Sequence, residues 1–334
     1  MMQVVLSTGS NQSRTMRTFL TIVTILFSYV SLKAQTTRIN FTADQFYPEG
    51  IAYNSKQNLF YIGSVKTGTI ATVNSAGKFT EWHVDPALKS SFGMKVDSGR
   101  NILWVCTGDP NYSIYSDSST FKKIIRLIGL DLNTGKKVKD YNLSALYNGR
   151  HFPNDLAVDR EGNIYLTDSY SPVIYKVDNN GTAEVFADNE KFGSLGIGLN
   201  GIAWHPDGFL VVVNNGTGAL FKIQVKDPRN IQRILTKSFF PGGDGLLFNN
   251  NQQLILVQNK GVNKIFVLNS NDNWNSAEIE MATAAEDRFH QPSTCTIKGG
   301  KVYVVNSKLN ELQDKSVTPS KDFSLQVAEF SRAK

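Results

Sequence analysis

A short strand-and-turn unit recurs six times along this 334-residue chain. In residues 151–177, HFPNDLAVDREGNIYLTDSYSPVIYKV, three short β-branched or aromatic runs are separated by Asp, Asn, Gly and Pro. This pattern is typical of successive antiparallel strands. Related units begin at residues 48, 92, 199, 243 and 292. The repetition limits the fold to a family of stacked or circularly arranged sheets.

Superposing the six units aligns one position near the start of each first strand. The aligned residues are Glu49, Phe92, Asn154, Asn200, Asp244 and Ser293. Most of their separations lie in the forties, a period that with four strands per repeat is typical of propeller blades. We therefore predict an all-β protein, a six-bladed β-propeller of four-stranded blades. The first strand of each blade should line a central channel, which brings the aligned residues together.

The two ends of the repeat array predict how the ring closes. The sixth unit has one strand fewer than the others, and residues 37–41 form an isolated strand candidate before the first unit. An N-terminal strand that completes the last blade would leave no free sheet edge. Gly50, Gly201 and Gly245, which follow aligned residues, should permit close packing of backbone around the channel.

Two insertions are predicted on the face where the first strands begin. Residues 110–120 interrupt the second unit and residues 307–322 interrupt the sixth. They are either a cover over the channel mouth, with Tyr112 as a candidate contact, or ordinary polar surface loops. The sequence leaves both interpretations open.

The N-terminal region has the order of a secretory signal peptide. Arg14 and Arg17 precede an apolar run over residues 19–30, and a small-residue site ends at Ala34. We predict a signal peptide over residues 1–34 and a single propeller domain over 35–334, with Met16 as an alternative start and an uncleaved anchor as the alternative fate. The mature protein is then exported to the periplasm or the cell exterior, without stable membrane insertion.

Charge and cysteine content exclude several classes of function. Removal of residues 1–34 takes away three basic residues and no acid, so the formal charge falls from +6 to +3. The basic residues are scattered rather than clustered, which argues against a nucleic-acid partner. Cys106 and Cys295 lie in the second and sixth units and are predicted to be unpaired thiols. The sequence does not determine the oligomeric state.

The aligned residues predict a cation site. Glu49, Asn154, Asn200 and Asp244 supply two carboxylates and two amide oxygens, the ligands that hard cations prefer. Two crowded carboxylates repel each other unless a cation neutralises them. We predict a divalent metal, with Ca²⁺ first and Zn²⁺, Mg²⁺ or Mn²⁺ as alternatives. The competing interpretation is that Asn and Asp at strand starts are merely turn residues.

The same residues resemble a known family. The ordered motifs Pro48-Glu49-Gly50, Pro153-Asn154-Asp155, Leu199-Asn200-Gly201 and Gly243-Asp244-Gly245 resemble the SMP-30/gluconolactonase/LRE family over nearly the whole mature chain. That family comprises six-bladed propellers with a divalent cation at the channel, and it includes lactonases and phosphotriesterases. The resemblance implies that Glu49, Asn200 and Asp244 are metal ligands. It also implies that Asn154 completes the metal shell or contacts substrate, and that Asp244 is the catalytic base or nucleophile.

These features favour a divalent-metal-dependent hydrolase, a lactonase or esterase acting on a small molecule at the channel. Candidate substrate contacts are Asn154, Arg150, His151, Tyr112 and Ser293. Arg150 lies four residues before Asn154, which departs from the closer spacing of the family's lactonases. His151 has packing as its simpler explanation. The alternative function is a non-catalytic propeller that a metal stabilises and that binds a ligand or partner.

Overall fold

Short antiparallel strands make up nearly all of the regular structure in the computed structural model, which describes residues 38–284, 288–314 and 316–333. These residues belong to one unit, Arg38–Lys334. Within the described part there is no α-helix, only the short 3-10 turns η1 (Pro86–Leu88), η2 (Glu190–Phe192) and η4 (Leu309–Leu312). The predicted signal peptide lies outside the described residues.

Four sheets contain four strands each. Their members in chain order are β2 (Pro48–Asn54), β3 (Leu59–Ser64), β4 (Ile70–Val73) and β5 (Phe79–His83); β6 (Ser90–Asp97), β7 (Ile102–Gly108), β8 (Ile125–Asp131) and β9 (Lys137–Asn142); β10 (Pro153–Val158), β11 (Ile164–Asp168), β12 (Val173–Val177) and β13 (Ala183–Asp188); and β1 (Arg38–Thr42), β22 (Pro292–Lys298), β23 (Lys301–Asn306) and β24 (Asp322–Val327).

The fifth sheet contains nine strands rather than two separate sets of four. It comprises β14 (Leu199–His205), β15 (Phe209–Asn214), β16 (Leu220–Gln224), β17 (Asp227–Thr236), β18 (Gly243–Phe248), β19 (Leu254–Gln258), β20 (Lys264–Asn269), β21 (Ser276–Thr283) and β25 (Phe330–Arg332). The sheet is continuous because β17 and β21 pair in parallel through Leu235–Ser276 and Thr236–Ala277. The predicted all-β class is therefore confirmed, whereas the division into six separate four-stranded sheets is not.

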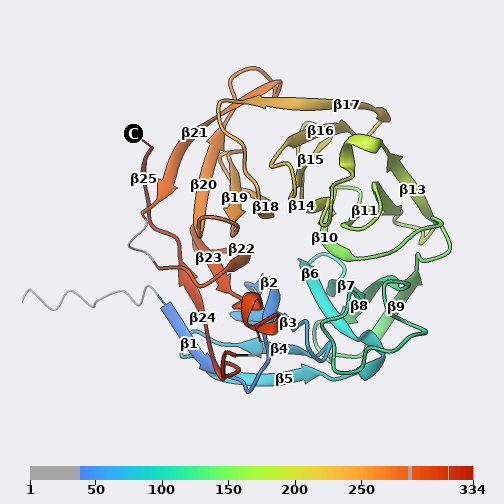
Figure 1. Ribbon diagram of the computed structural model, residues 1–334, viewed down its shortest axis with the longest axis vertical. Helices are drawn as coiled ribbons and strands as arrows, with labels where there is room; N and C mark the ends of the chain where they lie inside the picture. Colours follow the sequence, from blue (N-terminus) through green and yellow to red (C-terminus); the bar gives the residue numbers. More distant parts are fainter. Residues whose placement is uncertain (1–37, 285–287, 315, 334) are drawn as a thin grey trace, which may run out of the picture. The chain divides into compact units, whose positions relative to one another are not determined.

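The first strands of the repeats form a closed circuit at the centre of the unit (Figure 1). Strands β2, β6, β10, β14, β18 and β22 each contact the next, and β22 contacts β2. Close packing here requires glycine, since a Cβ on Gly50 would lie 2.0 Å from Phe92 O and one on Gly201 2.1 Å from Asp244 O. The predicted role of these two glycines is confirmed.

Each inner strand carries the same irregularity at its start. The register with the neighbouring strand shifts between Pro48 and Gly50 in β2, and a corresponding shift occurs in the five other inner strands. In every case the shifted segment contains the residue that the sequence alignment placed in the common position. A β-bulge bends its strand and redirects a side chain. The bulges thus give the six aligned residues an equivalent setting around the centre.

The ends of the chain meet as the sequence predicts. Strand β1 pairs in antiparallel fashion with β24, from Arg38 opposite Gln326 to Thr42 opposite Asp322. Phe41 is buried against Phe79 of β5 and Phe323 of β24, with ring centroids 6.0 and 6.1 Å apart. The N-terminal strand therefore joins the C-terminal sheet to the first sheet.

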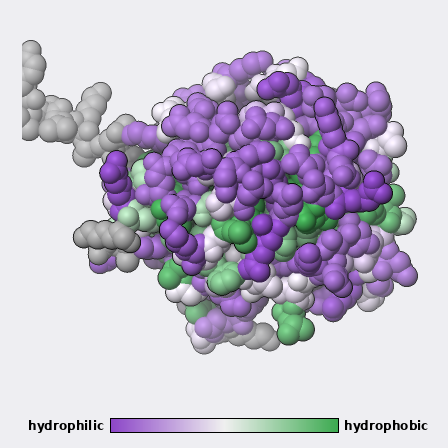
Figure 2. Space-filling model, turned by 90° about the horizontal axis from the view of Figure 1, so that it is seen from above, coloured by the Kyte–Doolittle hydropathy of each residue, from purple (hydrophilic) through white to green (hydrophobic). Residues whose placement is uncertain are grey.

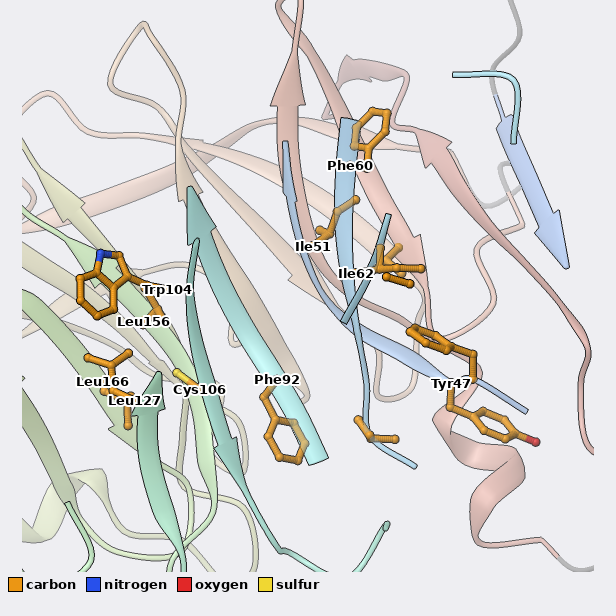
Figure 3. Packing of buried hydrophobic residues seen from close by; sticks show 14 of the residues in the cluster. Tyr47, Ile51, Phe60, Ile62, Phe92, Trp104, Cys106, Leu127, Leu156 and Leu166 are labelled. Carbon is orange, nitrogen blue, oxygen red and sulfur yellow. The ribbon is translucent and has the colours of Figure 1, made fainter. Parts of the chain in front are cut away.

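Apolar side chains fill the space between sheets. One cluster extends from Tyr47, Ile51 and Phe60 to Phe92 and Leu156, so it spans several sheets (Figure 3). Cys106 and Cys295 are both buried and free, as predicted. Among the described residues, no helix has the length and apolar character needed to cross a membrane.

Phe41→Ala tests the role of β1. Loss of a buried ring that bridges two sheets should lower the free energy of unfolding by about 3 kcal/mol, as one cooperative transition in urea. The neighbouring Asn40 has an exposed side chain, so Asn40→Ala should change stability by less than about 0.5 kcal/mol. Equal effects of the two substitutions would contradict the bridging role.

Candidate functional site

The structure brings together the four oxygen-donating residues that the sequence aligned. Glu49, Asn154, Asn200 and Asp244 come from β2, β10, β14 and β18, and all four are buried. We call these four the hub residues. Three of their oxygens, Glu49 Oε2, Asn154 Oδ1 and Asn200 Oδ1, have no hydrogen-bond partner. Buried polar atoms without partners are rare because desolvation is costly, so three at one place require an explanation.

Hydrogen bonds hold the two amides with their oxygens unpaired. Asn154 Nδ2 donates to Ser169 Oγ at 3.0 Å, and Ser169 Oγ donates to Leu199 O at 2.5 Å. The Asn200 side chain bonds to Asp244. Both amide nitrogens are thus engaged as donors, which leaves each amide oxygen available as an acceptor or ligand.

Asp244 has a partner that the sequence did not indicate. Asn259, in the connection between β19 and β20, donates through Nδ2 to Asp244 Oδ2 at 2.5 Å and to Pro292 O at 3.0 Å. Asn259 therefore fixes the orientation of the carboxylate and ties it to the start of β22. It lies in a polar segment without any motif, so no sequence signal distinguished it.

The electrostatics of the hub are unfavourable for bare carboxylates. Burial raises the pKa of Glu49 well above its usual value, and the charges of Asp244 and Asp155 raise it further. Burial also raises the pKa of Asp244 strongly, opposed by its hydrogen bond from Asn259. Burial and like charge thus penalise the ionised forms of Glu49 and Asp244, a penalty that a cation beside them would remove.

One lysine partly offsets this charge. Lys95 of β6 lies with Nζ 3.7 Å from Asp155 Oδ1, and its charge also acts to lower the pKa of Glu49. Asp155 in turn accepts hydrogen bonds from Leu156 N at 2.8 Å and Ile202 N at 3.4 Å. Sequence reasoning missed Lys95. Its position three residues after the aligned Phe92, on an inner strand, is the signal that could have identified it.

The insertion at residues 110–120 brings Tyr112 within electrostatic range of the hub. Tyr112 is half-buried, and burial together with the charges of Tyr170, Glu49 and Asp244 raises its pKa to about 12. Its hydroxyl bonds to Gln313, which belongs to the second insertion. The two insertions therefore contact each other through Tyr112 and Gln313, and Tyr112 lies close enough to Glu49 and Asp244 for their charges to act on it.

Phe92, Phe152, Tyr170 and Tyr112 form a group of contacting aromatic rings, which we call the aromatic wall, and two cations lie beside it. Phe152 contacts Phe92, Tyr112 and Tyr170 with ring centroids 5.0, 6.1 and 5.3 Å apart. Arg150 and Lys122 lie over the Tyr170 ring, at 5.9 and 5.1 Å from its centroid. Arg150 is exposed to solvent.

His151 and Ser293 have other partners. His151 is buried, with Nδ1 2.7 Å from Asp168 Oδ2 and Nε2 3.2 Å from Ser144 O. Ser293 donates through Oγ to Glu49 O at 2.6 Å and lies 2.5 Å from Ser307 Oγ. Both polar groups are engaged in hydrogen bonds within the protein.

The donor set suits a hard divalent cation. Carboxylate and amide oxygens are the ligands of Ca²⁺, and the three unpaired oxygens supply what a cation shell requires. No group of three or more His, Cys, Asp and Glu side chains in the described part of the chain could hold a metal ion. Any site at the hub therefore depends on the amides of Asn154 and Asn200 as well as on the two carboxylates.

Described cavities lie away from the hub. One of about 620 Å³ is lined by Arg38, Phe41, His290 and Lys308, and another of about 520 Å³ by His205, Phe209 and Trp274. Neither contains a hub residue. In the described part of the chain, the hub combines buried unpaired oxygens with buried carboxylates that repel each other, a combination that neither open groove has.

No family model matches the sequence, and no curated protein matches it. The fold does match solved structures over most of its length. The allergen Mala s 1 of Malassezia sympodialis has a TM-score of 0.71 at 18% identity, covering 89% of this chain and 97% of its own. A luciferin-regenerating enzyme has a TM-score of 0.60 at 16% identity, covering 89% and 99%.

A gluconolactonase from Xanthomonas campestris has a TM-score of 0.57 at 16% identity, covering 86% of this chain and 88% of its own. At these identities the likeness shows the fold. It supports the resemblance to the gluconolactonase and luciferin-regenerating-enzyme family at that level, and the chemistry must be argued from the chain's own residues.

Asp168 offers a test of how the aromatic wall is held. Its Oδ1 accepts from Phe152 N at 2.9 Å, Tyr170 N at 3.0 Å and Ser171 N at 3.2 Å, beside the His151 contact. Asp168→Ala leaves these buried donors without a partner and should cost at least about 3 kcal/mol of unfolding free energy. Asp188→Ala, at an exposed residue of β13, should cost less than about 0.5 kcal/mol. Chemical denaturation measures both, and comparable losses would refute this role.

Proposed function

We propose that this protein is a divalent-metal-dependent hydrolase of the lactonase or esterase type, acting on a small molecule at the hub. The observation that carries the proposal is the set of three buried unpaired oxygens, Glu49 Oε2, Asn154 Oδ1 and Asn200 Oδ1, beside Asp244. Likeness of fold to a gluconolactonase and a luciferin-regenerating enzyme favours lactones and esters as substrates.

The proposal includes the fold, which we infer to be a six-bladed propeller of the SMP-30/gluconolactonase/LRE type. Two antiparallel runs within the nine-stranded sheet, β14 to β17 and β18 to β21, then count as two blades joined at their outer strands. Six inner strands in a closed circuit, each with a bulge at the aligned residue, support this interpretation.

The metal in the proposal is Ca²⁺, with Mg²⁺, Mn²⁺ and Zn²⁺ as alternatives. Glu49, Asn154, Asn200 and Asp244 would be its protein ligands, and water would complete a shell of about 6–8 oxygens. A divalent ion held there polarises a carbonyl or phosphoryl oxygen and lowers the pKa of a bound water.

Asp244 has the catalytic role. With Oδ2 fixed by Asn259, its carboxylate can take a proton from water as that water attacks the acyl carbon, and return it to the leaving alkoxide when the C–O bond breaks. Tyr112 excludes bulk water above the hub, while Arg150 and Asn154 are the proposed substrate contacts. His151 and Ser293 are left out of this set because their polar groups are occupied.

We also propose that the protein is exported. The basic, apolar and small-residue order of residues 1–34 supports a signal peptide and a periplasmic or extracellular enzyme. Millimolar calcium outside the cell would suit a site of moderate affinity.

A second candidate is a non-catalytic propeller that the metal stabilises. The observation in its favour is that the hub residues are buried and line none of the described cavities. In that case the ion would hold the inner strands together, and the surface above it would bind a partner.

Calcium titration tests the cation site directly. Binding to the folded state alone should raise the free energy of unfolding by about 2.7 kcal/mol when free calcium is a hundred times the Kd. Glu49→Gln removes one negative charge from the hub and should abolish most of this calcium-dependent stabilisation. The control Asp207→Asn changes an exposed residue in the turn between β14 and β15 and should retain the stabilisation. Thermal unfolding with and without chelator measures the difference, and no calcium response in the wild type would reject the site.

Turnover on lactones, aryl esters and phosphotriesters tests the hydrolase. Asp244→Asn should lower kcat/KM at least about 100-fold with the fold retained by circular dichroism, and chelator should have a similar effect on the wild type. Calcium stabilisation without turnover on any of these substrates would favour the non-catalytic propeller instead.

A further inference from the structure

Exposed apolar side chains are concentrated at one end of the strands. Of eleven exposed large hydrophobic residues in the described part of the chain, nine lie on connections at the end where the inner strands begin. These nine are Val84, Ile114, Tyr115, Phe121, Leu146, Leu195, Phe239, Val262 and Val317. The other two, Val138 and Leu235, lie within the outer strands β9 and β17.

Strand direction defines this end. In an antiparallel run the connection after the second strand, and the link from the fourth strand to the next run, emerge where the first strand starts. We call this the hub face. Its connections are residues 43–47, 65–69, 84–89, 109–124, 143–152, 169–172, 189–198, 215–219, 237–242, 259–263, 288–291 and 307–321. The hydrogen bond from Asn259, in one of these connections, to Asp244 is consistent with this assignment.

The opposite face provides an internal comparison. Its connections are residues 55–58, 74–78, 98–101, 132–136, 159–163, 178–182, 206–208, 225–226, 249–253, 270–275, 299–300 and 328–329. None of the exposed large hydrophobic residues of the described chain lies there. Single exposed apolar residues are ordinary on any protein. The restriction of nine such residues to the connections of one face is unusual.

The balance of basic and acidic residues also differs between the two faces. Hub-face connections carry eleven Lys and Arg against seven Asp and Glu among the described residues, and twelve against nine when Lys315, Glu286 and Asp287 are counted from the sequence. Opposite-face connections carry six of each. Lys191 and Lys260 are exposed on the hub face and have no ion-pair partner among the described residues. A net positive face attracts anionic surfaces.

The apolar residues lie on separate loop tips rather than in one patch. Leu195 is 107% exposed between Gly193 and Gly196, so its side chain projects freely. Seen from above, hydrophobic residues lie as separate small groups among hydrophilic ones, in the central and lower parts of this view (Figure 2). Dispersed apolar tips among lysines suit shallow insertion between headgroups better than a folded partner, which needs a continuous complementary area.

We propose that the hub face docks on an anionic lipid surface. Apolar tips such as Leu195 and Phe239 enter the interface between headgroups and acyl chains, while lysines and arginines pair with the headgroup phosphates. Charge complementarity selects anionic lipid over a neutral bilayer. This surface is peripheral, and it does not depend on whether the hub is catalytic.

Sedimentation with sucrose-loaded vesicles tests the proposal on the purified chain. Vesicles of phosphatidylcholine with about 30% phosphatidylglycerol should bind the wild type at 0.1 M salt, and pure phosphatidylcholine should bind it at least tenfold more weakly. Raising the salt to 0.5 M should weaken binding, because the Debye length shortens. Leu195→Ser with Phe239→Ser should reduce the partition coefficient at least tenfold, as should Lys191→Gln with Lys260→Gln.

Control substitutions outside the hub face test whether vesicle binding depends on that face. Val138→Ser, and Lys136→Gln with Lys226→Gln, change exposed residues outside the hub face and should leave binding within twofold of the wild type. Absence of binding to anionic vesicles, or equal losses from both sets of variants, overturns the proposal. It is also overturned if the Leu195 and Phe239 substitutions abolish self-association in sedimentation equilibrium while no vesicle binding is found.

Discussion

Mutual repulsion of buried carboxylates at the centre of a ring of strands is the constraint on which the rest of the structure depends. Glu49, Asp155 and Asp244 are all buried there, with Lys95 as the cation that acts on them. Burial and like charge both raise the pKa of Glu49 and so penalise its ionised form. A divalent cation would remove this penalty and give partners to the unpaired oxygens of Glu49, Asn154 and Asn200.

The bulges explain how distant residues share one setting. Each inner strand shifts register at its aligned residue, so the backbone presents that side chain to the centre before regular pairing resumes. Glycine at positions 50 and 201 then permits neighbouring strands to approach. The sequence period, the bulges and the glycines all reflect one requirement, namely that six inner strands pack closely with equivalent starts. The equivalent positions of the aligned residues were therefore predictable from the sequence.

Features that depend on pairs of unrelated segments were not predictable. Asn259 is one of many polar loop residues until the fold brings it to Asp244, and Lys95 resembles any half-exposed lysine of a strand. The sequence likewise gives no signal that Asp168, seventeen residues after His151, is the hydrogen-bond partner of that imidazole. The joining of β17 to β21 rests on two residue pairs at the ends of outer strands, which carry no periodic signal.

The central claim is that one divalent cation lies among Glu49, Asn154, Asn200 and Asp244. Anomalous diffraction from crystals grown with Ca²⁺ and with Mn²⁺ would test it most directly. The account predicts a single strong peak within about 2.0–2.6 Å of oxygens from all four side chains. A hub without a peak at saturating metal, or a peak bound only by residues elsewhere, would contradict it.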